Sequence, residues 1–211
     1  MILAMRAIAL AWLLLTSACA ATPPVQERTW YWLGSLRSLS EMQSPRPEAY
    51  TLQIRDGRAA IRADCDRGSG AVTLEGNRVS FGPMATTRAF CPPPSRGDDY
   101  ARGLQAAERA SVTGDVLRLD LKDDAAMFFS TDPKARIAHF RCREERMLSV
   151  VYAGEAAQLW FDGAHYVLAR EPAASGGRYG DGRVTFHTQG VLGTVRKGDA
   201  VLAQNCQIPS R

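Results

Sequence analysis

Six residues near the C-terminal end bring together side chains that recognise a partner by hydrogen bonding. They are Ser175, Gly176, Arg178, Tyr179, Gln189 and Gly190. Hydroxyl and amide groups next to glycine are typical of exposed loops and turns, where their donors face outward. No G-x-S-x-G motif surrounds Ser175, so a nucleophilic serine is not indicated. The pattern predicts either a recognition loop or a plain glycine-rich hairpin, and it predicts no catalytic site.

Other residue types that support catalysis or metal binding show no useful spacing. Asp64, Asp66 and Glu75 match three positions of a calcium-loop pattern, but Ser69 stands where that loop needs glycine. No C-x-x-C motif is present, and the spacing of the histidines does not suit zinc. No pair of carboxylates is singled out for acid–base work. We therefore expect no catalytic residues, no metal, no cofactor and no enzymatic activity.

The N-terminus has the pattern of an export signal. Arg6 precedes nine apolar residues, 7–15, a run that suits a signal peptide and is too short to span a bilayer. Residues 18–20 (Ala-Cys-Ala) fit ordinary signal cleavage, whereas residues 16–19 (Thr-Ser-Ala-Cys) resemble a lipobox in which Cys19 carries lipid. Both alternatives place the protein in a bacterial cell envelope, either in the periplasm or anchored by lipid to the outer membrane. We expect a signal peptide over 1–20 and a polar tether over 21–28.

The composition is that of a globular chain with an ordinary charged surface. The 26 Lys and Arg residues nearly balance the 22 Asp and Glu residues, and the formal net charge is +4. These charges are scattered and form no basic run, which argues against nucleic acid as a partner.

Residues 29–130 predict a small α+β domain. Turn signals separate short strands at 51–54, 59–63, 71–74 and 78–81, and further strands are expected within 112–121 and at 127–129. The alanine-rich stretch 100–110 predicts the one convincing helix. We expect Trp30, Tyr31 and Trp32 to pack in the core of this domain.

This region resembles the META domain, also called the heat-shock-lipoprotein-like domain. The matching residues are Trp32-Leu33, Tyr50, Cys65, Gly70, Ser80-Phe81-Gly82, the segment 86–91 (Thr-Thr-Arg-Ala-Phe-Cys) and the strand 114–119 (Gly-Asp-Val-Leu-Arg-Leu). Asp66 departs from the family pattern, which usually has asparagine after the cysteine. The resemblance implies a small α+β fold and no chemistry.

A second domain is predicted after a polar, proline-containing linker at 131–136. Residues 137–211 contain about seven short strands with tight turns and no helical pattern, which favours a small antiparallel β-barrel. His165 and His187 alternate with apolar neighbours in two of these strands. We expect both histidines on the barrel surface or at an interface.

The second domain resembles the bacterial inhibitors of C-type lysozyme, which are membrane-bound or periplasmic. In that family an S-G-x-x-Y loop lies beside a K-G turn at the binding surface. Ser175, Gly176, Tyr179 and Gly190 match, whereas Gln189 replaces the lysine. The resemblance implies that lysozyme is the partner and that the loop enters its cleft, with Arg178 as a further source of charge. It also implies weak inhibition here; the alternative is a non-enzymatic envelope module that does not inhibit lysozyme.

Four cysteines remain after export: Cys65, Cys91, Cys142 and Cys206. An even number in an exported chain indicates disulfides, and three pairings are possible. We expect Cys65–Cys91 and Cys142–Cys206, because each bond then lies within one predicted domain.

Overall fold

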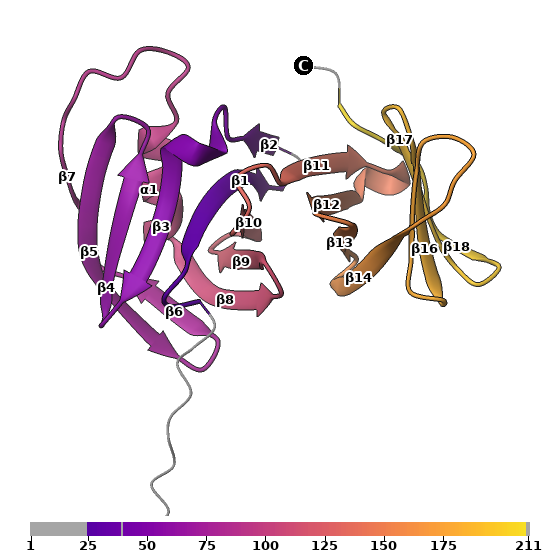
Figure 1. Ribbon diagram of the computed structural model, residues 1–211, viewed down its shortest axis with the longest axis horizontal. Helices are drawn as coiled ribbons and strands as arrows, with labels where there is room; N and C mark the ends of the chain where they lie inside the picture. The colour runs from indigo at the N-terminus through magenta and orange to yellow at the C-terminus, as the bar shows by residue number, and fades with distance from the viewer. Residues whose placement is uncertain (1–24, 39, 210–211) are drawn as a thin grey trace, which may run out of the picture.

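The computed structural model describes residues 25–38 and 40–209, and it shows two β-barrels lying side by side (Figure 1). The chain is mainly β, as the sequence predicted. The signal peptide, Cys19 and the first part of the tether lie outside the described residues.

The N-terminal sheet closes on itself, which the sequence did not predict. Of its ten described strands, eight form the ring because β10 pairs with β1 as well as with β9. The ring strands are β1 (Thr29–Arg37), β3 (Tyr50–Arg55), β4 (Arg58–Ala63), β5 (Asp66–Glu75), β6 (Arg78–Phe81), β8 (Ala107–Thr113), β9 (Val116–Leu121) and β10 (Ala125–Ser130). The short strands β2 (Ser40–Gln43) and β7 (Ala85–Thr86) pair with β1 and β5 outside the ring. A short 3-10 turn, Pro47–Ala49, leads into β3.

Alternating side chains fill this barrel with aromatic rings. Trp30 and Trp32 are fully buried, which confirms their predicted place in the core, and Tyr31 between them is half-buried. The Trp32 ring lies 5.4 Å from the rings of both Tyr50 and Tyr100. The alternation of side chains along an antiparallel strand is what aims every second residue inward.

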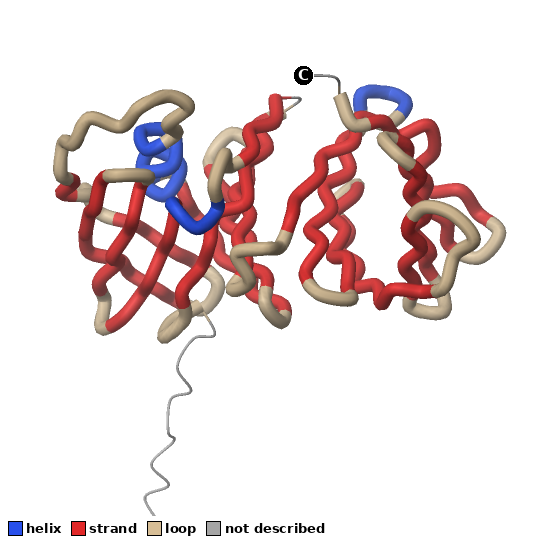
Figure 2. Tube along the Cα trace, turned by 45° about the horizontal axis from the view of Figure 1, so that its top comes forward, coloured by secondary structure: helices blue, strands red, loops and turns tan. Residues whose placement is uncertain are grey.

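The α-helix of the described chain differs from the helix expected at 100–110. The helix α1 spans Gly97–Gln105, and the alanine-rich residues that follow form β8 instead (Figure 2). Tyr100 and Leu104 point from α1 into the barrel core. Alanine has the highest helix propensity, but the preference amounts to less than about 1 kcal/mol per residue, and pairing of β8 with β9 outweighs it.

The second barrel is closed by eight strands among the described residues. They are β11 (Arg136–Arg141), β12 (Met147–Ala153), β13 (Ala156–Phe161), β14 (Ala164–Glu171), β15 (Gly177–Gly180), β16 (Val184–Gln189), β17 (Leu192–Lys197) and β18 (Ala200–Gln207). A 3-10 turn, Arg143–Glu145, links β11 to β12. Strand β15 overlaps the segment 175–179, which the sequence indicated as a loop.

Both expected disulfides are present. Cys65 is bonded to Cys91 and Cys142 to Cys206. The second bond fastens the barrel seam, where β11 and β18 share the single residue pair Arg141 and Gln207. Closing a loop of 64 residues stabilises the fold by about 4 kcal/mol on the chain-entropy model.

The outer walls of the two barrels pack against each other. Leu33, Val116 and Phe128 of the first barrel form one buried cluster with Ile137 and Val151 of the second. The amide of Gln158 donates a 2.9 Å hydrogen bond across this contact to the carbonyl oxygen of Thr113. The barrels therefore form a continuous packed structure.

The last residues of the predicted tether are part of the first barrel. Val25 is buried in its core, and its carbonyl oxygen accepts a 2.8 Å hydrogen bond from the Trp30 indole. The sequence pattern did not reveal this contact, because one valine among polar residues carries no periodic signal.

Candidate functional site

Strand pairing brings the Ser175 loop beside the Gln189 turn. Residues 172–176 connect β14 to β15, and β15 pairs with β16, so that Gly177 lies opposite Thr188. The side chain of His187 reaches the same loop: its Nε2 lies 3.2 Å from the carbonyl oxygen of Ser175. Two segments that are separate in the sequence thus form one exposed end of the barrel.

Gly176 is required for this close approach. Its φ is +69°, a conformation that residues with a side chain rarely adopt. A Cβ atom at this position would collide with the carbonyl oxygen of Thr188 and lie 3.2 Å from the Cα of Gln189. The glycine after Ser175 is therefore explained by contact between the two segments.

Gly190 has a separate role in the tight turn between β16 and β17. Gln189 and Leu192 pair across this hairpin, so Gly190 and Val191 are its two central residues. Gly190 has a φ of +59°, and a glycine at the first central position suits a two-residue hairpin turn. The side chains of Gln189, Val191 and Leu192 are all exposed here.

The sequence-predicted residues differ in how they are presented. Ser175, Gly176, Gln189 and Gly190 are exposed, so their polar groups are accessible to a partner. Arg178 is exposed too, but its Nε lies 2.7 Å from a carboxylate oxygen of Glu171. Its charge is therefore paired within the barrel and is not a free contact for a partner.

Tyr179 lies in the barrel core. Its side chain is buried, and its ring lies 5.6 Å from that of Tyr152 and 6.3 Å from that of Phe186. Burial, followed by the neighbouring Tyr179, raises the pKa of Tyr152 and keeps this phenol neutral. Tyr179 therefore supports the strand that carries the loop.

His165 and Asp64, which the sequence patterns also singled out, are both held by contacts within the protein. His165 stacks on Trp160 at the contact between the barrels, with ring centres 4.6 Å apart. Partial burial and the nearby Arg118 lower the pKa of His165. Asp64 is buried and paired with Arg46 at 2.6 Å, which accounts for one of the three acids in the calcium-like pattern.

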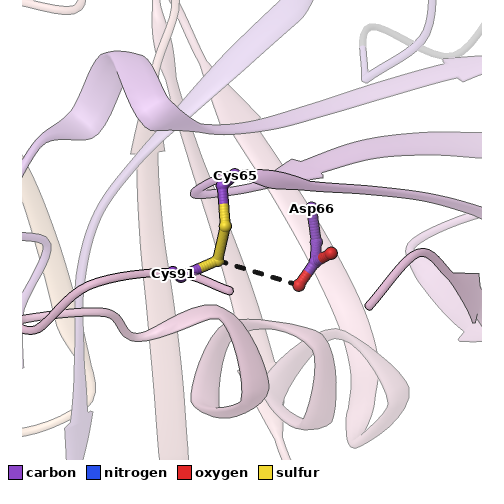
Figure 3. Close-up of side chains that lie close together, drawn as sticks. All are labelled: Cys65, Asp66 and Cys91. Carbon is purple, nitrogen blue, oxygen red and sulfur yellow. Dashed lines mark hydrogen bonds between the residues drawn. A yellow bond between two sulfur atoms is a disulfide. The ribbon is translucent and has the colours of Figure 1, made fainter. Parts of the chain in front are cut away.

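Asp66 organises the loop that ends at Cys91. One carboxylate oxygen accepts hydrogen bonds from the Thr87 hydroxyl and the Ala89 amide, at 2.7 and 2.8 Å. The hydrogen bond from the Ala89 amide lowers the pKa of Asp66 most, and the hydrogen bond from the Thr87 hydroxyl lowers it further. The Cys91 sulfur lies 3.8 Å from the other oxygen (Figure 3).

Among the described residues, Cys65, Asp66 and Cys91 form a cluster with the spacing of metal ligands. Both sulfurs of this cluster belong to a disulfide, which leaves the Asp66 carboxylate as the one ionised group (Figure 3). A disulfide offers no thiolate to a metal. The cluster is therefore a structural device that holds the 87–91 loop to β5.

Two family models match the chain in sequence order. The META domain matches residues 24–134, more than half of the chain. The chain therefore belongs to the META domain family, and this domain forms the first barrel. The second barrel resembles a different family: residues 140–204 match the membrane-bound lysozyme-inhibitor of c-type lysozyme. The chain thus carries a META domain, followed by a barrel that matches the lysozyme-inhibitor family.

An NMR structure of a protein from Burkholderia xenovorans is 19% identical and aligns with 50% of this chain and 82% of that one, with a TM-score of 0.44. No curated protein matches the chain. Within the described residues, the helices are too short or too polar to cross a membrane.

Proposed function

We propose that this protein is a non-enzymatic inhibitor of C-type lysozyme in the bacterial cell envelope. The observation that carries the proposal is the exposed junction of the Ser175–Gly176 loop with the Gln189–Gly190 turn. Both segments lie within the part of the chain that matches the inhibitor family. Their contact is specific, because Gly176 fits beside Thr188 only in the absence of a Cβ atom.

The mechanism is obstruction of the lysozyme cleft. C-type lysozyme cleaves its glycan with a general-acid glutamate and a second carboxylate that lies nearby. A loop that occupies this cleft excludes the glycan, and donors on the loop replace the water that solvates the carboxylates. The Ser175 hydroxyl and the Gln189 amide are the donors that this surface offers.

The inhibition is weak because both donors are neutral. A lysine ammonium adds ion-pair attraction to its hydrogen bond with a cleft carboxylate, about 1 kcal/mol or more at 4 Å, whereas a neutral donor contributes the hydrogen bond alone. Gln189 replaces the family lysine, and Arg178 is already paired with Glu171. The difference corresponds to roughly one order of magnitude in affinity.

The test is a titration of lysozyme activity with the purified mature protein and two variants. Gln189→Lys adds a charge-assisted contact and is expected to tighten inhibition about tenfold or more. Ser175→Ala removes a donor and is expected to weaken it. Gln105→Lys is the matched control, because Gln105 is exposed on α1 in the other domain and adds the same charge away from the site.

Failure of both the parent and Gln189→Lys to inhibit, with both proteins folded, would overturn the proposal. A non-inhibitory envelope module would then remain as the alternative. An equal gain from Gln189→Lys and Gln105→Lys would assign the effect to overall charge instead of the cleft contact.

We also propose that Cys19 carries a lipid that holds the protein at the outer membrane. The support is its position four residues after the apolar run of the signal, with a polar stretch behind it. Mass spectrometry of the mature N-terminus should find a lipid-modified cysteine, and Cys19→Ala should release the protein from the membrane fraction. A mature chain that begins after residue 20 without lipid would contradict this assignment.

A further inference from the structure

Two adjacent aliphatic side chains project from the exposed end of the second barrel. Val191 is 50% exposed and Leu192 is 52% exposed, and both follow directly after the Gln189–Gly190 pair. Other exposed valines of this barrel, Val167 and Val201, lie on β14 and β18 away from the turn. An apolar pair beside a recognition loop differs from single exposed residues, which are common on protein surfaces.

The pair adjoins the Gln189–Gly190 side of the candidate site. Leu192 pairs with Gln189 across the hairpin, and Gly176 lies against the backbone of Thr188 and Gln189 on the other side. On the opposite edge, the amide of Ile208 donates a 2.9 Å hydrogen bond to the carbonyl oxygen of Val191. Val191 and Leu192 therefore extend the polar surface with an apolar patch on the same end of the barrel.

The backbone beneath the patch is held firmly. Leu192 pairs with Gln207 and Gly193 with Cys206, and Cys206 is bonded to Cys142. A side chain on a fixed backbone loses little conformational freedom when it binds, so more of its contact contributes to affinity.

The near absence of charge in residues 172–178 and 189–192 also favours an apolar contact with the partner. Residues 172–178 and 189–192 include one charged side chain, Arg178, and that charge is paired with Glu171. A surface of this kind cannot depend on ion pairs with the partner. The cleft of C-type lysozyme suits it, because the general-acid glutamate there sits in an apolar pocket beside a tryptophan.

We infer that Val191 and Leu192 are the apolar anchors through which this chain binds the lysozyme cleft, in place of the charge that Gln189 lacks. This inference rests on the proposed function and adds the residues and the type of contact that determine affinity. It has a further consequence: inhibition by the parent protein should change little with salt, because apolar contacts are not screened. Inhibition by Gln189→Lys should be the more salt-dependent of the two.

The experiment compares inhibition constants for lysozyme at low and high salt. Val191→Ser and Leu192→Ser are each expected to weaken inhibition by about tenfold, and the double variant by more. Val167→Ser and Val201→Ser are matched controls with similar exposure and should behave as the parent. Thermal melting of each variant checks the fold, and Val191→Thr, which keeps the side-chain shape, replaces Val191→Ser if that variant is unstable.

The outcomes separate this inference from the proposed function. A parent that inhibits together with unchanged Val191→Ser and Leu192→Ser variants would overturn the inference and leave the inhibitor assignment intact. Loss of inhibition in the control variants as well would overturn it too, by assigning the effect to general surface change. A folded parent and Gln189→Lys variant that both fail to inhibit would overturn the two proposals together.

Discussion

At the scale of single residues, glycines explain more of the candidate site than the polar side chains do. Gly176 allows the Ser175 loop to touch β16, and Gly190 forms the turn that presents Gln189. The polar residues contribute donors, but their placement depends on backbone conformations that glycine makes accessible. The S-G and Q-G pairs are thus two parts of one contact.

We expect Gly176→Ala to displace the Ser175 loop and to destabilise the barrel by about 1–3 kcal/mol, from left-handed strain together with the collision at Thr188. Inhibition of lysozyme should fall with it. Chemical denaturation measures the first effect and the activity titration the second.

Gly182→Ala is the matched control for this substitution. Gly182 has a φ of +83° in the same barrel, but no atom lies within 4 Å of the Cβ position. Gly182→Ala introduces the left-handed strain without a collision, so it should lower the free energy of unfolding less than Gly176→Ala does. Equal costs for the two variants would show that contact with Thr188 contributes nothing.

At the scale of elements, most strands could be predicted from the sequence. The predictions were wrong where the local pattern of residues was weak, at β8 and β15. Turn residues such as Asp56-Gly57 and Asp162-Gly163 stand between strands as expected, because positive φ at these positions is a local property. The alanine-rich stretch after Gln105 forms β8, since its partner strand is supplied by residues further along the chain. Strand β15 escaped notice because a Gly-Arg-Tyr-Gly segment has little β-propensity.

Asp66 illustrates how one side chain organises an element. Its carboxylate accepts the Thr87 hydroxyl and the Ala89 amide, and the neighbouring Cys65 bonds to Cys91. The loop is therefore fixed at three points along its length. An aspartate performs this task where the META pattern usually has asparagine, because both side chains offer an oxygen acceptor.

At the scale of the whole molecule, the contact between the barrels contains a fully buried histidine. His139 of β11 lies with its ring 5.7 Å from that of Phe128 in the first barrel, and its Nδ1 lies 2.9 Å from the Ser149 hydroxyl. Burial lowers the pKa of His139 to about 4. The imidazole is therefore neutral in the folded protein at ordinary pH.

This buried histidine makes folding stability depend on pH. In the unfolded chain a histidine binds a proton below about pH 6.5, whereas the folded protein resists protonation until about pH 4. The contribution of His139 to stability is thus fully present above about pH 6.5 and should fall by roughly 3 kcal/mol as the pH drops toward 4. His139→Gln should flatten this dependence.

Denaturant midpoints measured across this pH range test the prediction, together with NMR titration of the His139 ring. His165→Gln is the comparison variant at the same contact. His165 is more exposed than His139, and its pKa is lowered by partial burial and by the nearby Arg118. A pH profile that is the same with and without His139 would contradict the prediction.

The sequence alone determined the features that depend on local chemistry. These include the mainly β class, most turn positions and the buried tryptophans of β1. Such features can be predicted because they follow from backbone preferences and from alternating burial along a strand. The likeness of each half to a family also follows from residues within that half.

Only the tertiary structure decided how distant segments meet. It closed the first barrel through β10 and β1, paired the charge of Arg178 with Glu171, placed Tyr179 in the core and left Val191 and Leu192 exposed. It also packed Phe128 against His139 between the two domains. The physical reason is that these contacts join residues whose own sequence surroundings are compatible with several environments, so the choice is made by packing across the whole chain.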